Sequence, residues 1–265
     1  MADDVVLSES RGAVRLLTLN RPDRLNAWNG ALETRYFTLL DEAEADPDVR
    51  VIVVTGAGKG FCAGADMDML QGIGDAGVSA EPRKHYPAYY ATTLNTPVIA
   101  AINGACAGIG LVHAMMCDIR FAAAGAKFTT AFARRGLIAE HGVSWVLPRL
   151  IGPAKAMDVL LSGRVFVSEE AEDLGMVNKV VAPDALLDET IAYANDLAAN
   201  SSPSSMAVMK RQIWAALSQS ISEATSEADG LMRQSLREAD FKEGVASFVE
   251  KRPPAFNPVQ DWAKP

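Results

Sequence analysis

Cysteine, histidine and basic residues are scarce in this sequence of 265 residues. It has 3 cysteines, 3 histidines and 25 lysines plus arginines against 33 acidic residues, so its net charge is -8. A chain this acidic lacks the basic face that nucleic-acid binding requires, and we expect no nucleic-acid partner. Cys62, Cys106 and Cys117 form no CxxC pair and lie among apolar residues or glycines. We therefore expect free, buried thiols and a reducing, cytoplasmic location.

Long hydrophobic runs are also missing. The N-terminus is acidic and has no apolar signal core. Residues 97–118 come nearest to a membrane span, but Asn103, His113 and several glycines interrupt them. A strand, a turn and a helix explain this stretch better than a transmembrane helix. We expect no membrane partner.

Two apolar runs rich in valine and isoleucine each lead into a glycine-rich stretch. The first is 51–55 (VIVVT) before 56–66 (GAGKGFCAGAD), and the second is 97–102 (PVIAAI) before 103–110 (NGACAGIG). Such runs predict buried strands. Glycines that follow a strand let the backbone approach a ligand and turn its N–H groups outward. Two such turns in one domain predict a pair of backbone donors that converge on one oxygen, as in an oxyanion hole.

The remaining pattern alternates strands and helices and then becomes helical. Further extended segments are expected at 5–8, 14–20, 119–123 and 127–130, and helices at 29–45, 66–72 and 83–94. This alternation predicts an α/β core with mainly parallel strands. From residue 183 onward, helices are expected at 186–199, 204–217, 221–240 and 241–251. A helical tail of this size packs either on its own core or on a neighbouring subunit.

Ordered motifs run through nearly the whole chain. They include 19–22 (LNRP), 24–27 (RLNA), 60–66 (GFCAGAD), 101–104 (AING), 136–142 (GLIAEHG), 147–149 (LPR), 175–178 (GMVN) and 250–253 (EKRP). In these residues the chain resembles the crotonase, or enoyl-CoA hydratase/isomerase, superfamily. The resemblance implies an α/β fold: a spiral of β-β-α units in residues 1–200, and a helical C-terminal trimerisation region in 201–265. It also implies homotrimers, which often pair into hexamers.

The resemblance further implies an acyl-CoA thioester as substrate, so that coenzyme A enters with the substrate and neither a separate cofactor nor a metal is expected. The two oxyanion-hole amides map onto Ala65 and Ile109. Their task is to hold the thioester oxygen as it becomes an enolate, and losing one such donor costs about 10²–10³ in rate. Substrate or CoA contacts map onto Arg24, Ala27, Ala63, Asp66, Gly108 and Lys251. One possibility for Lys251 is that it reaches the ligand from a neighbouring subunit. For Asp66 the alternative to a ligand contact is a structural role, in which its side chain fixes the turn.

The chain departs from the pattern of the hydratases, which use two glutamates. The position of the first is Val112 and the position of the second is Phe132. Neither side chain can move a proton, and each missing acid-base group costs about 10²–10⁴ in rate. An efficient hydratase of the two-glutamate type is therefore not expected.

One acid remains in this region, Glu140, where the chain resembles the peroxisomal-type enoyl-CoA isomerases at their catalytic glutamate. Moving a double bond from C3 to C2 needs a single base that removes a proton from C2 and returns it at C4. We expect burial beside Phe132, Ile138 and Trp145 to make this carboxylate a better proton acceptor. The structural alternative is that Glu140 caps, or lies in the first turn of, a helix that begins near His141.

Three functions therefore stay open. The first, which we favour, is an enoyl-CoA isomerase with Glu140 as base. The second is a hydratase, or another lyase, that uses Glu140 as its only acid. The third is an acyl-CoA-binding protein without catalytic activity.

Overall fold

Two β-sheets form the centre of the protein. The structure is a computed structural model that describes residues 4–76 and 86–264. The larger sheet has the strand order β1-β2-β3-β5-β7-β10, and only β1 runs antiparallel to its neighbour. These strands are β1 (Val6–Arg11), β2 (Val14–Leu19), β3 (Val51–Gly56), β5 (Val98–Ile102), β7 (Ile119–Ala123) and β10 (Lys179–Val181). The strands β3 and β5 are buried along their whole length, as the apolar runs predicted.

The smaller sheet is built from short strands that follow the glycine-rich turns. Its order is β4-β6-β8-β9, with β4, β6 and β8 parallel and β9 antiparallel to β8. These strands are β4 (Gly60–Cys62), β6 (Ala105–Ala107), β8 (Lys127–Thr129) and β9 (Phe166–Val167). Because β4, β6 and β8 are parallel, their carboxyl ends meet at one edge of the sheet.

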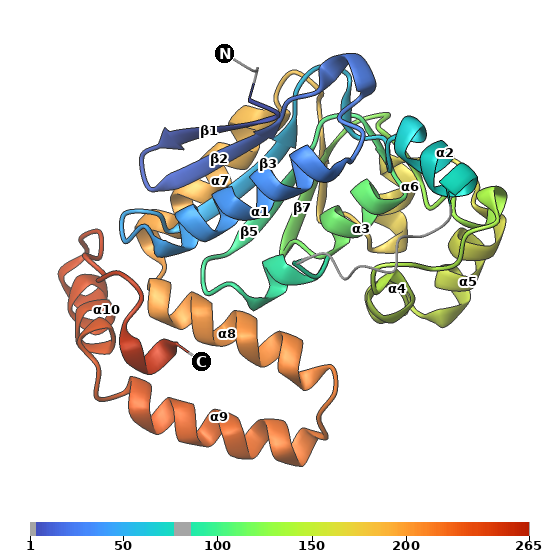
Figure 1. Cartoon of the computed structure of the whole chain (residues 1–265). Helices are drawn as coiled ribbons and strands as arrows, with labels where there is room; N and C mark the ends of the chain where they lie inside the picture. Colours follow the sequence, from blue (N-terminus) through green and yellow to red (C-terminus); the bar gives the residue numbers. More distant parts are fainter. Residues whose placement is uncertain (1–3, 77–85, 265) are drawn as a thin grey trace.

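Helices surround both sheets (Figure 1). In that view α1 lies in front of the larger sheet and α7 behind it, where α7 contacts β2, β3, β5 and β7. The helices α2 to α6 lie together on the side away from α10, where α3 contacts β4 and β6 and α6 contacts β8 and β9; α8 to α10 lie below the larger sheet in this view. Their bounds are α1 (Gly30–Ala45), α2 (Met67–Ala76), α3 (Ile109–Met115), α4 (Val143–Ile151), α5 (Pro153–Ser162), α6 (Ser168–Leu174), α7 (Leu186–Asn200), α8 (Pro203–Ala216), α9 (Ile221–Ser235) and α10 (Ala239–Glu250).

A buried lysine attaches α8 to the core. The Nζ of Lys210 lies 2.8 Å from Oδ2 of Asp118 and donates hydrogen bonds to the carbonyl oxygens of Ala91 and Thr96. The indole of Trp214 donates to the same aspartate. A buried charge that is paired and fully hydrogen-bonded in this way fixes orientation, because losing one partner would leave the other unpaired.

The next helix has no such attachment. α9 is held at its start by a capping box between Ser220 and Glu223, yet none of its residues is buried. Large apolar side chains on α8 to α10 stand in solvent, among them Ile213, Ile221 and Phe248. This surface agrees with a tail that docks on another subunit; the division of the chain at residue 200 and the role in trimerisation stay predictions.

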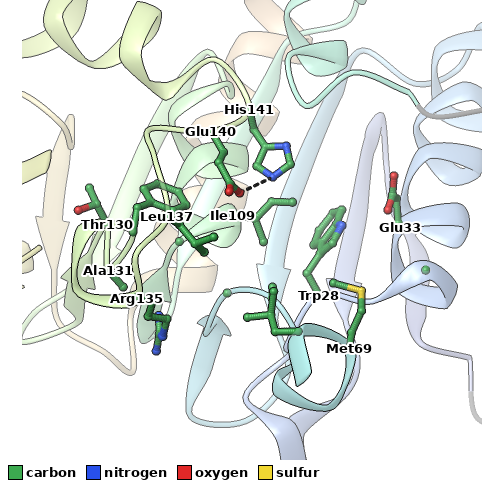
Figure 2. A pocket seen from close by; sticks show the side chains of 16 residues that line it. Trp28, Glu33, Met69, Ile109, Thr130, Ala131, Arg135, Leu137, Glu140 and His141 are labelled. Atoms are coloured by element: carbon green, nitrogen blue, oxygen red, sulfur yellow. Dashed lines mark ion pairs between the residues drawn. The ribbon is translucent and has the colours of Figure 1, made fainter. Parts of the chain in front are cut away.

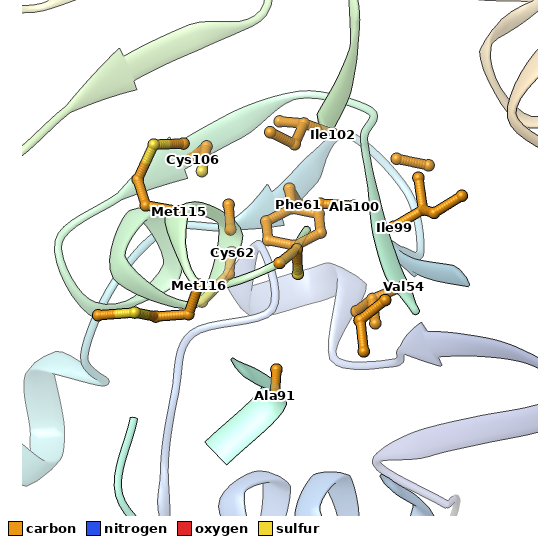
Figure 3. Packing of buried hydrophobic residues seen from close by; sticks show 14 of the residues in the cluster. Val54, Phe61, Cys62, Ala91, Ile99, Ala100, Ile102, Cys106, Met115 and Met116 are labelled. Atoms are coloured by element: carbon orange, nitrogen blue, oxygen red, sulfur yellow. The ribbon is translucent and has the colours of Figure 1, made fainter. Parts of the chain in front are cut away.

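The core joins the two sheets through α3 (Figure 3). Phe61, Cys62, Cys106 and Met115 are fully or almost fully buried there. A Cβ added to Gly110 would lie 2.5 Å from the carbonyl oxygen of Cys62, so only glycine lets α3 approach β4 this closely. The prediction of free, buried cysteines is confirmed. Burial raises the pKa of the Cys62 thiol to about 11 and that of Cys117 to about 12.

The predicted α/β class is confirmed, with several differences in the elements. Of the expected helix at 83–94, residues 83–85 lie outside the described part, and the rest holds only a 3-10 helix, Tyr90–Thr93. The expected helix at 221–240 ends at Ser235, and a separate helix begins at Ala239. The sequence analysis also missed the smaller sheet as a unit, because the strands of that sheet have only two or three residues. The helices α5 and α6 were missed as well.

Candidate active site

A cavity of about 440 Å³ opens where β4, β6 and β8 end. Each strand contributes the residues that follow it: Gly64 and Ala65 after β4, Gly108 and Ile109 after β6, and Thr130 to Phe132 after β8. Glu140 and His141 complete one side, and Trp28 and Glu33 lie on the other (Figure 2). The structure thus brings Ala65, Gly108, Ile109 and Glu140 to one cavity, as the sequence analysis expected of them.

The backbone N–H of Ala65 has no hydrogen-bond partner among the described residues. Ala65 pairs with Trp28 in an isolated parallel bridge. In that bridge the carbonyl oxygen of Gly64 accepts a hydrogen bond of 2.8 Å from the N–H of Trp28, and the N–H of Asp66 donates one of 2.9 Å to the carbonyl oxygen of Trp28. Since the groups of Ala65 itself point away from the bridge, its N–H is left for a ligand.

The N–H of Ile109 is available for a different reason. Ile109 is the first residue of α3, and the first N–H groups of a helix have no carbonyl within the helix to bind. The N-cap, Gly108, has no side chain to satisfy them and adopts φ 50°. The two glycine turns touch, because a Cβ on Gly108 would lie 3.7 Å from Cα of Gly64. Both free amides therefore belong to backbone segments in direct contact.

Glu140 lies on the loop before α4 with its carboxylate toward the cavity (Figure 2). Its Oε2 is 3.4 Å from Nε2 of His141. His141 has φ 56°, a left-handed conformation that is uncommon for residues other than glycine. Strained residues of this kind often occur at functional sites, where the surrounding structure holds them.

Two expectations about Glu140 are wrong. Its side chain is 33% exposed, and its expected neighbours Ile138 and Trp145 are 79% and 36% exposed, so apolar burial does not enclose it in this chain. Nor does Glu140 cap a helix: α4 begins at Val143 with Gly142 as its N-cap and has no acidic residue in its first turn. The structural alternative for Glu140 is thereby removed.

The two positions that lack glutamate have different surroundings. Phe132 lines the cavity and is almost fully buried. Val112 is fully buried inside α3. Neither side chain can transfer a proton, so the structure has no acid-base group at either position of the two-glutamate pattern.

The structure adds a carboxylate that the sequence analysis missed. Glu33, in the first turn of α1, lines the same cavity from the side opposite Glu140 (Figure 2). From the sequence alone, an acid in the first turn of a helix is explained by the helix dipole. The expectation that Glu140 is the only acid at the site is therefore wrong.

Asp66 serves the turn. Its carboxylate accepts a hydrogen bond of 2.7 Å from Arg21 and another from the N–H of Asp68, and it does not line the cavity. The pKa of Asp66 is held below its usual value, mainly by the hydrogen bond from the Arg21 guanidinium and to a lesser extent by the nearby positive charges. The carboxylate thus stays ionised and fixes the segment that carries Ala65.

The other expected CoA contacts lie outside the cavity. Arg24 is 61% exposed and makes only a loose ion pair of 3.4 Å with Asp68, which leaves its guanidinium open to solvent. Ala27 accepts a hydrogen bond from Arg21. The N–H of Ala63 donates to the carbonyl of Leu25. Their contact with coenzyme A stays a prediction.

Lys251 is remote from the cavity within one chain. It ends α10 in a left-handed conformation and is exposed. Figure 1 shows α10 on the opposite side of the molecule from α2. This placement favours a contact from a neighbouring subunit, and the contact of Lys251 with coenzyme A stays a prediction.

The described residues hold neither a helix that could span a membrane nor a cluster of metal-binding side chains. No helix in the part of the chain with assigned structure is long and apolar enough to cross a membrane. Across residues 4–76 and 86–264, no group of three or more histidine, cysteine, aspartate or glutamate side chains is arranged to hold a metal ion.

Known proteins resemble this chain over most of its length. The chain is 36% identical to the 1,2-epoxyphenylacetyl-CoA isomerase of Escherichia coli over 258 residues, which cover 96% of this chain and 98% of that protein. The crystal structure of an enoyl-CoA hydratase from Mycobacterium marinum is 53% identical, with a TM-score of 0.70, and covers 80% of this chain and 98% of its own. The enoyl-CoA hydratase from Bacillus anthracis is 29% identical, with a TM-score of 0.88 and coverage of 96% and 99%.

A family model described as enoyl-CoA hydratase/isomerase matches residues 9–259. The match spans both glycine turns, the loop with Glu140 and the helical tail. Together with relatives above 30% identity over almost the full length, it confirms the crotonase-type fold expected from the motifs. The chain belongs to the enoyl-CoA hydratase/isomerase family, the crotonase superfamily of enzymes.

Proposed function

We propose that this enzyme is an acyl-CoA isomerase that moves a double bond from C3 to C2 of an enoyl-CoA thioester. The observation that carries the proposal is the single cavity that holds two unpaired backbone N–H groups, of Ala65 and Ile109, together with the carboxylate of Glu140. The name of the Escherichia coli relative, an isomerase of a CoA thioester, supports the same class of reaction.

In this mechanism the thioester oxygen accepts hydrogen bonds from both amides. Glu140 removes a proton from C2, and the electron pair of that C–H bond moves into the thioester to form a dienolate. The amides stabilise the negative charge on its oxygen, and they do so best in the transition state. The dienolate then takes the proton back at C4, which leaves the double bond between C2 and C3 and Glu140 ionised again.

His141 has a positioning role in this scheme. Its Nε2 faces the carboxylate of Glu140 at 3.4 Å and therefore limits the orientations that the carboxylate can adopt. The side chain also lines the cavity, so it occupies space beside the substrate.

The second candidate is a hydratase, and one observation favours it. Glu33 gives the cavity a second carboxylate, and the Mycobacterium marinum structure bears the name of a hydratase. Hydration would need one carboxylate to activate water and another group to protonate C2. An arrangement with Glu140 and Glu33 would be unlike the two-glutamate pattern, because Glu33 lies on a different helix from Val112.

The test compares two substrates and three variants. The wild type should convert 3-enoyl-CoA to 2-enoyl-CoA and hydrate 2-enoyl-CoA poorly, as measured by absorbance of the conjugated thioester. Glu140→Gln should lower kcat for isomerisation by about 10²–10⁴. Glu42→Gln, an exposed glutamate on α1, is the matched control and should keep wild-type activity.

The alternatives give other results. Rapid hydration of 2-enoyl-CoA that is lost in both Glu140→Gln and Glu33→Gln would establish the hydratase. Tight binding of acyl-CoA without turnover of either substrate would establish a binding protein. Isomerisation that survives Glu140→Gln would show that another group is the base.

We further propose that the active assembly is a homotrimer or hexamer. The apolar surface on α8 to α10 and the complete lack of buried residues in α9 support it. In such an assembly we expect Lys251 to lie near the site of a neighbouring subunit.

A further inference from the structure

A second cavity adjoins the proposed active site. Its volume is about 330 Å³, and it shares Trp28, Glu33, Ile109 and His141 with the first. Since these four residues line both spaces, no more than one layer of side chains separates the compartments. In Figure 2, Ile109 lies between Glu140 and Trp28. A group that extends from the Ile109 amide past its side chain would therefore enter the second compartment.

Aromatic rings dominate the walls of this compartment. The rings of Trp28 and His113 stack with centroids 4.1 Å apart and an angle of 23° between planes. Phe37 and Tyr86 form a second stacked pair at 4.9 Å and 15°. Trp28 and Phe37 meet edge to face at 6.4 Å, which joins the two pairs into one cluster. All four rings line the compartment.

The polar atoms of these rings do not make the compartment charged. Desolvation by burial, and then the proximity of His141, lower the pKa of His113 to about 3, so its imidazole is neutral at physiological pH. The hydroxyl of Tyr86 donates to Asp41 on α1, as does that of Tyr90. The charged groups that line the space are Glu33 and, when protonated, His141, and both lie on the wall shared with the first cavity.

We propose that the preferred substrate carries an aromatic ring at the end of its acyl group, which this compartment binds. The inference rests on the proposed function, because it needs the thioester at Ala65 and Ile109. Aromatic side chains gain energy from ring–ring contact beyond the area that they bury, and a saturated chain offers no ring for that contact. Four uncharged rings beside the site therefore distinguish an aryl group from an alkyl chain of equal carbon number.

The experiment measures binding of thioesters that cannot isomerise. The ligands are 4-phenylbutanoyl-CoA and decanoyl-CoA, which have the same number of acyl carbons, and the readout is Kd by calorimetry on the full-length protein. We expect the aryl ester to bind about five- to tenfold more tightly, in line with the usual strength of aromatic contacts.

One variant removes a ring without opening the core. Phe37→Leu keeps an apolar side chain beside Tyr86 and should reduce the preference to about twofold or less by removing ring–ring contact. Tyr193→Leu is the matched control, because Tyr193 is a partly exposed ring on α7 that contacts Phe121 and lines neither compartment. It should keep the wild-type preference. If Phe37→Leu fails to fold, Tyr86→Leu serves the same purpose.

The outcomes separate the two proposals. Equal affinity for both esters, or a preference for decanoyl-CoA, would overturn this inference and leave the isomerase proposal intact. A preference for the aryl ester that survives both Phe37→Leu and Tyr86→Leu would also overturn it, since the ring would then bind elsewhere. If neither ester binds while the protein is folded, the proposed function itself fails.

Discussion

At the scale of single residues, the ion pair between Arg21 and Asp66 connects the sequence motif to the site. The pair is largely buried, with N and O atoms 2.7 Å apart, and it lies directly beside Ala65. Arg21 also donates to the carbonyl of Ala27 and so joins two segments of the chain. The motif residue Asp66 therefore acts on the position of the amide without touching the reacting atoms.

Replacing Asp66 by asparagine tests this role. We expect Asp66→Asn to lower the free energy of unfolding by about 1.5–3 kcal/mol, the usual range for hydrogen bonds to charged groups. Because the folded-state pKa of Asp66 is lowered, its contribution is present above about pH 4 and is lost as the pH falls below that value. Urea unfolding at pH 7 and pH 3 measures both effects. A variant as stable as the wild type at pH 7 would contradict the role.

His113 predicts a different dependence on pH. Its pKa is about 3 in the folded chain and about 6.5 when unfolded, so the unfolded chain binds the proton first as the pH decreases. Stability should therefore fall between pH 6.5 and pH 3, by up to about 1.4 kcal/mol per pH unit from this residue. His113→Phe keeps the ring beside Trp28 and should flatten that slope in urea unfolding curves. Equal slopes for both proteins would show that His113 does not titrate this way.

At the scale of elements, the contact between α3 and β4 fixes the distance between the two free amides. Gly110 allows that contact, because a Cβ there would collide with backbone and side chain of Cys62. The glycine turns were predictable because glycine has one clear reason to follow a buried strand. The contact itself was not, since it depends on packing between segments about 50 residues apart.

Gly110→Ala should therefore disturb the site from outside it. We expect a loss of about 1–3 kcal/mol in stability, the usual cost of overpacking, and at least a tenfold lower kcat as Ile109 moves away from Ala65. Gly72→Ala is the control, because that glycine lies in α2 with open space around it. Thermal unfolding of both variants measures the loss of stability, and isomerase assays measure the change in kcat. Full activity in Gly110→Ala would show that the amides do not need this spacing.

The backbone groups of the candidate site could be predicted from the sequence, whereas the surroundings of its side chains could be predicted only in part. Ala65, Ile109 and Glu140 could be placed from motifs. Glu33 could not, because its position in the cavity follows from the bridge between Trp28 and Ala65, which pairs residues distant in sequence. The partial exposure of Glu140 was likewise hidden, since an apolar neighbour in sequence such as Ile138 points elsewhere in space.

At the scale of the whole molecule, the helical tail leaves a large apolar surface uncovered. Phe248 on α10 is 84% exposed, and Ile213 on α8 and Ile221 on α9 are also largely exposed. Exposed apolar patches of this kind usually mark protein interfaces. We expect light scattering to report a trimer or a hexamer.

Phe248→Glu tests whether this surface holds the assembly. A charge in an apolar interface is costly unless it is paired, so the variant should dissociate or lose subunits at micromolar concentration. Lys242→Glu, on the same helix, changes charge without removing an apolar side chain and serves as the control. A wild-type monomer would contradict the proposed assembly outright, and an intact Phe248→Glu oligomer would place the interface elsewhere.

The two free N–H groups belong to the main chain, and this has an evolutionary consequence. Every amino acid except proline has a backbone N–H, so among all single substitutions at residues 65 and 109 only proline removes such a donor. Mutation can widen or narrow the space around the carbonyl, as isoleucine does at 109, while the donors persist. A lineage built on this scaffold can therefore explore new acyl groups by neutral drift without first losing its hold on the thioester.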